Sequence, residues 1–297
     1  MAFAKLYFVK NMRVRAILNP KLPYFCMSKK NKQTMQREKI YELLERKYNE
    51  YNSAVFIETD PISIPHRFSK KQDVEIAAFF SATIAWGNRK SIIASANELM
   101  NLMDNAPHDF VLNHQDKDLK RLLDFKHRTF NATDTLYFVE FLKQHYLKHE
   151  SLEDAFLKSA VRSRMSEATT ENAIATFHEN FFSLEDSPHR TRKHIATPVR
   201  GSTCKRMNMF LRWMVRKDKN GVDFGVWKKL KPAQLLIPLD VHVDRTARKL
   251  GLIKRKQTDW QTVLELTENL KQFDAKDPVK YDFALFGISI LDKMQIH

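Results

Sequence analysis

Apolar and polar residues recur along most of this chain with the period of an α-helix. The clearest case is residues 240–251, where Val243, Ala247 and Leu250 follow one another at intervals of four and three and share one helix face. Asp240 stands at the position of an N-cap, and Gly251 stands at the C-terminal stop. Similar patterns predict helices over 35–51, 73–84, 90–103, 107–123, 132–148, 151–163, 168–182, 203–217, 223–229, 258–272 and 278–293. Only six glycines occur, and the ten prolines lie between periodic segments, so the sequence predicts an all-α fold.

The 297 residues suffice for one large domain or two closely associated ones. Residues 1–34 show no lasting period and no signal-peptide hydrophobic region, so we expect a disordered basic segment there and an all-helical domain over 35–297. The same basic, acid-poor segment also fits an organelle transit peptide, or a protein whose true start is Met27 or Met35.

Cysteine and histidine usage argues against several kinds of site. Cys26 and Cys204 are the only cysteines, which disfavours a disulfide scaffold or structural zinc and excludes a four-cysteine iron–sulfur cluster within the chain. The eleven histidines show no metal-ligand spacing with acids, so we expect no metal and no cofactor. No apolar run is long enough to span a membrane, which favours a cytoplasmic protein.

The net charge of +15 is concentrated in two segments. Residues 1–40 and residues 189–219 each carry ten basic residues against one acid, while the remainder is close to neutral. A localised basic segment is typical of a polyanion-binding surface. We interpret residues 1–40 as a solvated tail and residues 189–219 as a binding segment.

The predicted helix 203–217 separates basic from apolar residues. Lys205, Arg212 and Arg216 fall on one stripe, and the opposite stripe is apolar. This predicts a basic ridge on the exposed face. Lys205 lies in the first turn, where the helix dipole and Arg206 disfavour an ammonium ion, so it is a candidate amine nucleophile. The residues alone favour the simpler interpretation, in which Lys205 is one of many solvated basic residues.

Residues 238–245 read Pro-Leu-Asp-Val-His-Val-Asp-Arg and precede Leu-Gly-Leu at 250–252. This pattern resembles the catalytic-aspartate segment of helix-hairpin-helix DNA glycosylases. The resemblance implies two helical subdomains flanking a cleft, with Lys205 as nucleophile, Asp240 as catalytic aspartate and His242 in a structural role. Lys205 and Asp240 stand 35 residues apart, about twice the family's usual interval, and this longer spacing most resembles the archaeal 8-oxoguanine glycosylase branch.

The resemblance extends to residues 76–89, which are similar to the helix and loop that probe the duplex. The family's Gly-x-Gly hairpin is reduced here to Gly201, and Thr83 replaces its probing glutamine. The candidates for probing or lining a base pocket are Trp86, Asn88, Arg89, Tyr281 and Phe286. The candidate DNA-binding residues are Arg190, Arg192, Lys193, Arg200, Arg206, Arg212, Arg216 and Arg245.

The resemblance therefore implies a monomeric DNA-repair glycosylase/lyase that excises an oxidised purine, such as 8-oxoguanine, through a lysine Schiff base. Its partner would be double-stranded DNA with a damaged base, and it would associate with the nucleoid when bound. A non-catalytic DNA- or RNA-binding protein on the same fold is the alternative. Residues 60–290 also resemble, more closely, an uncharacterised bacterial family of unknown function, which implies no chemistry.

Overall fold

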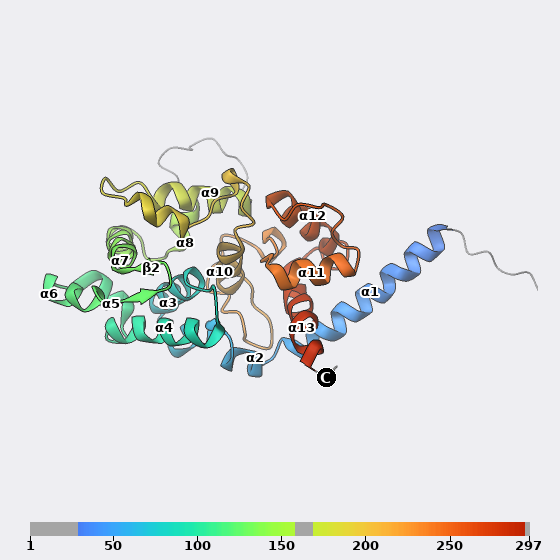
Figure 1. Ribbon diagram of the computed structural model, residues 1–297, viewed down its shortest axis with the longest axis horizontal. Coiled ribbons are helices and arrows are strands. Elements are labelled where there is room, and N and C mark those ends of the chain that lie inside the picture. Colours follow the sequence, from blue (N-terminus) through green and yellow to red (C-terminus); the bar gives the residue numbers. More distant parts are fainter. Residues whose placement is uncertain (1–28, 158–168, 295–297) are drawn as a thin grey trace, which may run out of the picture. The chain divides into compact units, whose positions relative to one another are not determined.

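The computed structural model describes residues 29–157 and 169–294, and it is mostly helical (Figure 1). The first helices are α1 (Lys29–Tyr51), α2 (Ala54–Glu58), α3 (Lys71–Thr83), α4 (Arg89–Leu102), α5 (Pro107–Asn113), α6 (Asp116–Leu119) and α7 (Ala132–Tyr146). The remaining helices are α8 (Glu153–Leu157), α9 (Thr170–Phe181), α10 (Lys205–Val215), α11 (Val241–Lys249), α12 (Trp260–Lys271) and α13 (Tyr281–Met294). Short 3₁₀ turns occupy Pro61–Ser63, Pro65–Arg67, Lys120–Leu122, His189–Lys193, Pro198–Arg200, Pro232–Gln234 and Pro278–Lys280.

Helix α10 lies in the middle of the compact unit that begins at Ile40. Helices α3–α9 gather on one side of it and α11–α13 on the other (Figure 1). Helix α10 packs against α3, and α11 packs against α13. Phe210, Leu211 and Trp213 are fully buried, as is Phe79 of α3, so the apolar stripe predicted for α10 is in the core.

The predicted helix 107–123 is divided into α5, α6 and a 3₁₀ turn. Gln115 interrupts it, because its side chain and that of Asp118 form a capping box that begins a new helix. A short hairpin follows that the sequence pattern did not predict. Strand β1 (Lys126–His127) pairs antiparallel with β2 (Phe130–Asn131), with Arg128 in the left-handed region at φ 55°.

The helix predicted over 223–229 is wrong. The amide groups of Phe224 and Trp227 donate to the carbonyl oxygens of Trp213 and Met214 at the end of α10. These tertiary hydrogen bonds use the donors that a helix would pair internally. Gly225 has a φ of 56°, which an α-helix does not allow. It also lies against Lys217, because a Cβ added at Gly225 would be 2.4 Å from the Cβ of Lys217.

Two predictions at the edges of the described residues have partial outcomes. The helix predicted to begin at residue 35 begins at Lys29, and the rest of the predicted disordered segment, 1–28, lies outside the described residues. Helix α8 ends at Leu157, and the remainder of the helix predicted over 151–163 lies outside them as well. Within the described residues, no helix has both the length and the apolar character that a membrane crossing requires. In the same residues, no three His, Cys, Asp or Glu side chains are placed to hold a metal ion.

Candidate functional site

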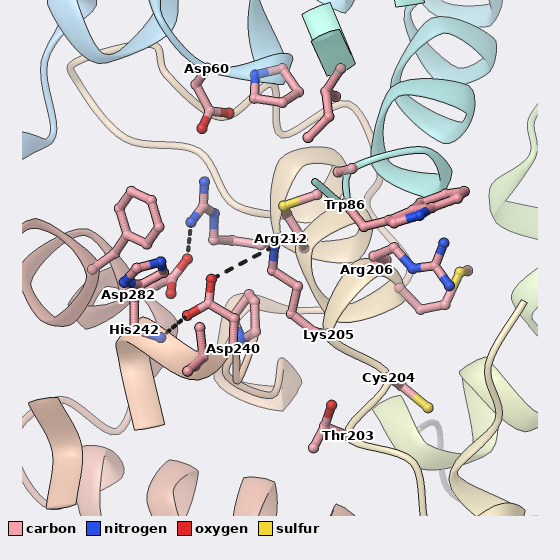
Figure 2. A pocket seen from close by; sticks show the side chains of 18 of the residues that line it. Asp60, Trp86, Thr203, Cys204, Lys205, Arg206, Arg212, Asp240, His242 and Asp282 are labelled. Atoms are coloured by element: carbon pink, nitrogen blue, oxygen red, sulfur yellow. Dashed lines mark hydrogen bonds and ion pairs between the residues drawn. The ribbon is translucent and has the colours of Figure 1, made fainter. Parts of the chain in front are cut away.

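Lys205 and Asp240 line a common cavity of about 710 Å³ (Figure 2). Lys205 is the first residue of α10, and Asp240 directly precedes α11. The Nζ atom of Lys205 lies 3.8 Å from Oδ2 of Asp240, and both side chains are partly exposed to the cavity. The sequence pattern predicted these residues at two helix starts, and the fold brings those two starts together.

The two carboxylate oxygens of Asp240 have different partners. Oδ1 accepts hydrogen bonds from the backbone amides of His242 and Val243, at 2.8 and 2.9 Å, and so caps α11. Oδ2 is left to face Lys205 (Figure 2). The predicted N-cap is therefore confirmed, and capping leaves one oxygen of Asp240 available to the cavity.

The chain turns sharply before Lys205. Gly201 and Cys204 both have positive φ, at 72° and 48°, and the carbonyl of Gly201 accepts from the amide of Trp260 at 3.0 Å. Cys204 is buried, and this burial raises the pKa of its thiol to about 12, which keeps the thiol neutral. No side chain among the described residues caps α10, so its first amides lie uncapped beside Lys205.

Asp282 in the first turn of α13 is a third ionisable group of the cavity, and the sequence pattern did not single it out. Arg212 donates to its Oδ2 (Figure 2). Burial, together with the nearby Asp240 and Asp223, raises the pKa of Asp282 to about 6 against the opposing effects of Arg212 and Lys205. A sequence signal did exist, because Asp282 is the one charged residue in the apolar run 281–291.

The predicted basic ridge on α10 is wrong. Arg212 and Arg216 are 3% and 1% exposed, because each is enclosed by carboxylates from other segments of the chain. Arg212 pairs with Asp223 and Asp282. The partners of Arg216 are Asp218, Asp223 and Asp277. These arginines hold α10 to the neighbouring loop and to α13, and neither is available to phosphate.

Trp86 lines the cavity with its indole ring already in contact with other side chains. The guanidinium of Arg206 lies 4.9 Å from the ring centroid, and the His194 ring stacks at 5.6 Å. Arg206 also donates to the carbonyl of Thr83, and burial lowers its pKa to about 10. Arg206 therefore forms part of the cavity wall, and Trp86 can stack on a base only if these neighbours move.

The other predicted pocket residues have mixed outcomes. Arg89 and Phe286 line the cavity, with the guanidinium 5.4 Å from the ring centroid. Asn88 caps α4 and is not among the residues lining the cavity. Tyr281 is wrong as a pocket residue, because its ring is fully buried and its hydroxyl donates to Glu45 at 2.6 Å.

Asp60 is another wall residue of the cavity that the sequence pattern did not single out. Its Oδ1 accepts from the amide of Ile62 at 3.1 Å, and its Oδ2 lies 4.0 Å from Arg89. Burial raises the pKa of Asp60, while Arg89 opposes that rise.

Arg190 and Arg192 are engaged within the protein. Arg190 pairs with Asp134, and Arg192 lies 4.6 Å from the centroid of Phe182. Three of the predicted DNA-binding residues are exposed, and we refer to them as the exposed cation group: Lys193, Arg200 and Arg245. Of the eight candidates, these three remain open to an external anion.

The cavity contains one amine, that of Lys205, several carboxylates and aromatic walls. Its volume lies within the range of small-molecule sites. An amine beside a carboxylate suits nucleophilic attack with proton transfer, provided that the carboxylate accepts the amine's proton.

Residues 60–291 match the model of a family described as a protein of unknown function, DUF2400. The match includes Lys205, Asp240 and Asp282, and the description states no activity. No curated protein matches the chain, and no solved structure matches it.

Proposed function

Because the chain belongs to the DUF2400 family, whose description states no activity, we propose its function from its site: a lysine-dependent DNA glycosylase/lyase that excises an oxidised purine. The observation that carries this proposal is the 3.8 Å approach of Lys205 Nζ to Asp240 Oδ2 inside a 710 Å³ cavity. The oxidised-purine class, with 8-oxoguanine as its example, comes from the resemblance of residues 238–252 to helix-hairpin-helix glycosylases.

The cavity suits a single flipped nucleotide. A base must leave the duplex before its glycosidic bond can be attacked, and enzymes that do this hold it in a closed pocket with aromatic walls. Trp86 and Phe286 line the cavity and provide such walls.

The chemistry assigns separate roles to the two central residues. Asp240 takes a proton from the Lys205 ammonium, and the neutral amine forms a bond to the sugar C1′ as the base leaves. The sugar ring then opens: the C1′–O4′ bond breaks, O4′ takes a proton, the nitrogen loses one, and a Schiff base to Lys205 remains. Strand scission follows by elimination from that intermediate.

Binding to the duplex would depend on the exposed cation group. Each lysine or arginine that contacts a phosphate releases counterions, which favours association at low salt. In this proposal the helices on the two sides of α10 are the two subdomains of a helix-hairpin-helix glycosylase-like fold, and the cavity is the cleft between them.

Borohydride trapping tests the proposal. The protein is incubated with a duplex carrying one 8-oxoguanine and reduced, and we expect a covalent complex that Lys205→Gln abolishes while DNA binding persists. Lys249→Gln is the matched control, because Lys249 is an exposed lysine of α11 that does not line the cavity. If the unaltered protein binds DNA but is neither trapped nor active on any oxidised purine, the non-catalytic DNA- or RNA-binding alternative is correct.

A further inference from the structure

We propose that Asp282 is the acid that protonates the departing base, a catalytic role that rests on the proposed function. The proposal starts from the position of this residue. Asp282 belongs to α13, whereas Lys205 begins α10 and Asp240 caps α11, yet all three side chains line the same cavity (Figure 2).

One oxygen of Asp282 is held and the other is open. Arg212 donates to Oδ2, which fixes the orientation of the carboxyl group. No donor among the described residues reaches Oδ1. The side chain is 11% exposed, and the residue lines the cavity. Oδ1 is therefore free to carry a proton toward a bound group.

The surrounding charges favour that proton. Arg212 and Arg216 are enclosed by four aspartates, Asp218, Asp223, Asp277 and Asp282, so the acids outnumber the arginines. Arg212 is shared between Asp282 and Asp223 and cannot fully compensate both. Asp240 adds negative charge from the start of α11, and Lys205 opposes it from α10. Burial, with the negative charges of Asp240 and Asp223, raises the pKa of Asp282 to about 6.

Asp240 and Asp282 differ in the way that a base and an acid should. Asp240 accepts hydrogen bonds from two backbone amides at Oδ1 and faces the Lys205 amine at Oδ2, so each of its oxygens has a donor beside it. Asp282 is buried and has only Arg212 as a donor among the described residues. Environments that separate two carboxyl groups in this manner are characteristic of acid–base pairs.

Asp60 is the other buried acid of the cavity, and it is less suited to this role. Its Oδ1 is engaged by the amide of Ile62, and its Oδ2 faces Arg89. Neither oxygen is as open as Oδ1 of Asp282, so we assign the proton to Asp282.

The step balances without any added reagent. The Lys205 Nζ–C1′ bond forms while the C1′–base nitrogen bond breaks, and the electron pair of the broken bond goes to the base nitrogen. That nitrogen, or an atom conjugated with it, takes the proton of Asp282. The proton that the Lys205 nitrogen loses as the sugar ring opens passes to O4′. The aspartate left behind takes a proton from solvent after the base has departed, which restores the acid.

The test uses two duplex substrates that differ only in whether a base remains to be released. One carries 8-oxoguanine and reports base release in a single turnover. The other carries a preformed abasic site and reports borohydride trapping, which needs Lys205 but no leaving base. We expect Asp282→Asn to slow base release by ~10²–10⁴-fold, the range for loss of a general acid, and to leave trapping at the abasic site unchanged.

Asp277→Asn is the matched control. Asp277 pairs with Arg216 in the same charged network but does not line the cavity, so the same substitution removes a comparable ion pair and should leave base release unchanged. Asp282→Glu keeps an acid and should restore part of the release rate. Wild-type release should fall as the pH rises above the pKa of Asp282, and Asp282→Asn should lose that dependence.

Each outcome decides between the two proposals. If Asp282→Asn releases the base at the wild-type rate, the role of Asp282 is overturned but the proposed function is not. An equal loss of base release and of abasic-site trapping in this variant also overturns that role, because it indicates that Asp282 is structural. If Asp282→Asn does not fold, wild-type release that stays constant through the pKa of Asp282 overturns it. A wild-type protein that neither releases the base nor is trapped overturns the proposed function, and this inference with it.

Discussion

Replacing Asp240 by asparagine separates its two roles, because the structure assigns one to each oxygen. The asparagine Oδ1 can still accept from the amides of His242 and Val243, so the cap of α11 remains. The amide nitrogen takes the place of Oδ2, which lies 3.8 Å from Lys205, so the negative charge and the proton acceptor disappear.

The expected magnitudes differ for stability and for activity. The ion pair is partly exposed, so its loss costs about 0–1 kcal/mol, and asparagine caps a helix about as well as aspartate. Asp240→Ala also removes the cap, which costs about a further 1 kcal/mol. At ~2–4 °C for each kcal/mol in a protein of this size, Asp240→Asn should melt close to the wild type and Asp240→Ala clearly below it. Both should slow base release by ~10²–10⁴-fold.

Thermal unfolding and single-turnover base release on the same preparations measure the two effects. Asparagine should retain stability and abolish most activity, while alanine should reduce both. Wild-type activity in Asp240→Asn would refute the catalytic role and leave Asp240 as an ordinary N-cap. Equal melting temperatures for the two variants would refute the assignment of Oδ1 to the cap.

Two further predictions concern the surface and the core. Alanine at all three residues of the exposed cation group should weaken DNA binding. It should also reduce the slope of log affinity against log salt by about 0.9 for each phosphate that is no longer neutralised, as measured by fluorescence anisotropy across a salt series. An unchanged slope would show that this group does not bind DNA. Gly287→Ala should destabilise the protein by about 1–3 kcal/mol, because an added Cβ would lie 2.0 Å from the ring of Tyr51, and a melting temperature equal to that of the wild type would contradict this packing.

The local pattern of the sequence sufficed for most of the helices and for the two helix starts at the site. The N-cap at Asp240 and the helix that begins at Lys205 follow from short-range chemistry, namely an acceptor before an apolar period and an apolar stripe along 207–214. The resemblance of residues 238–252 added the prediction that these two positions act together. The 3.8 Å approach of the side chains is the tertiary arrangement that such a pairing requires.

Tertiary structure alone decided which charges face solvent. A helical stripe of Lys205, Arg212 and Arg216 looks like an exposed ridge in sequence, yet the two arginines are buried because acids from the 218–223 loop and from 277–282 surround them. Asp282 acquires its open oxygen and its raised pKa from the same enclosure. Helical periodicity reports which residues share a face. Burial and charge pairing depend on segments far along the chain, such as Asp282, 70 residues from Arg212, and Tyr48, 168 residues from Arg216, whose positions no local pattern contains.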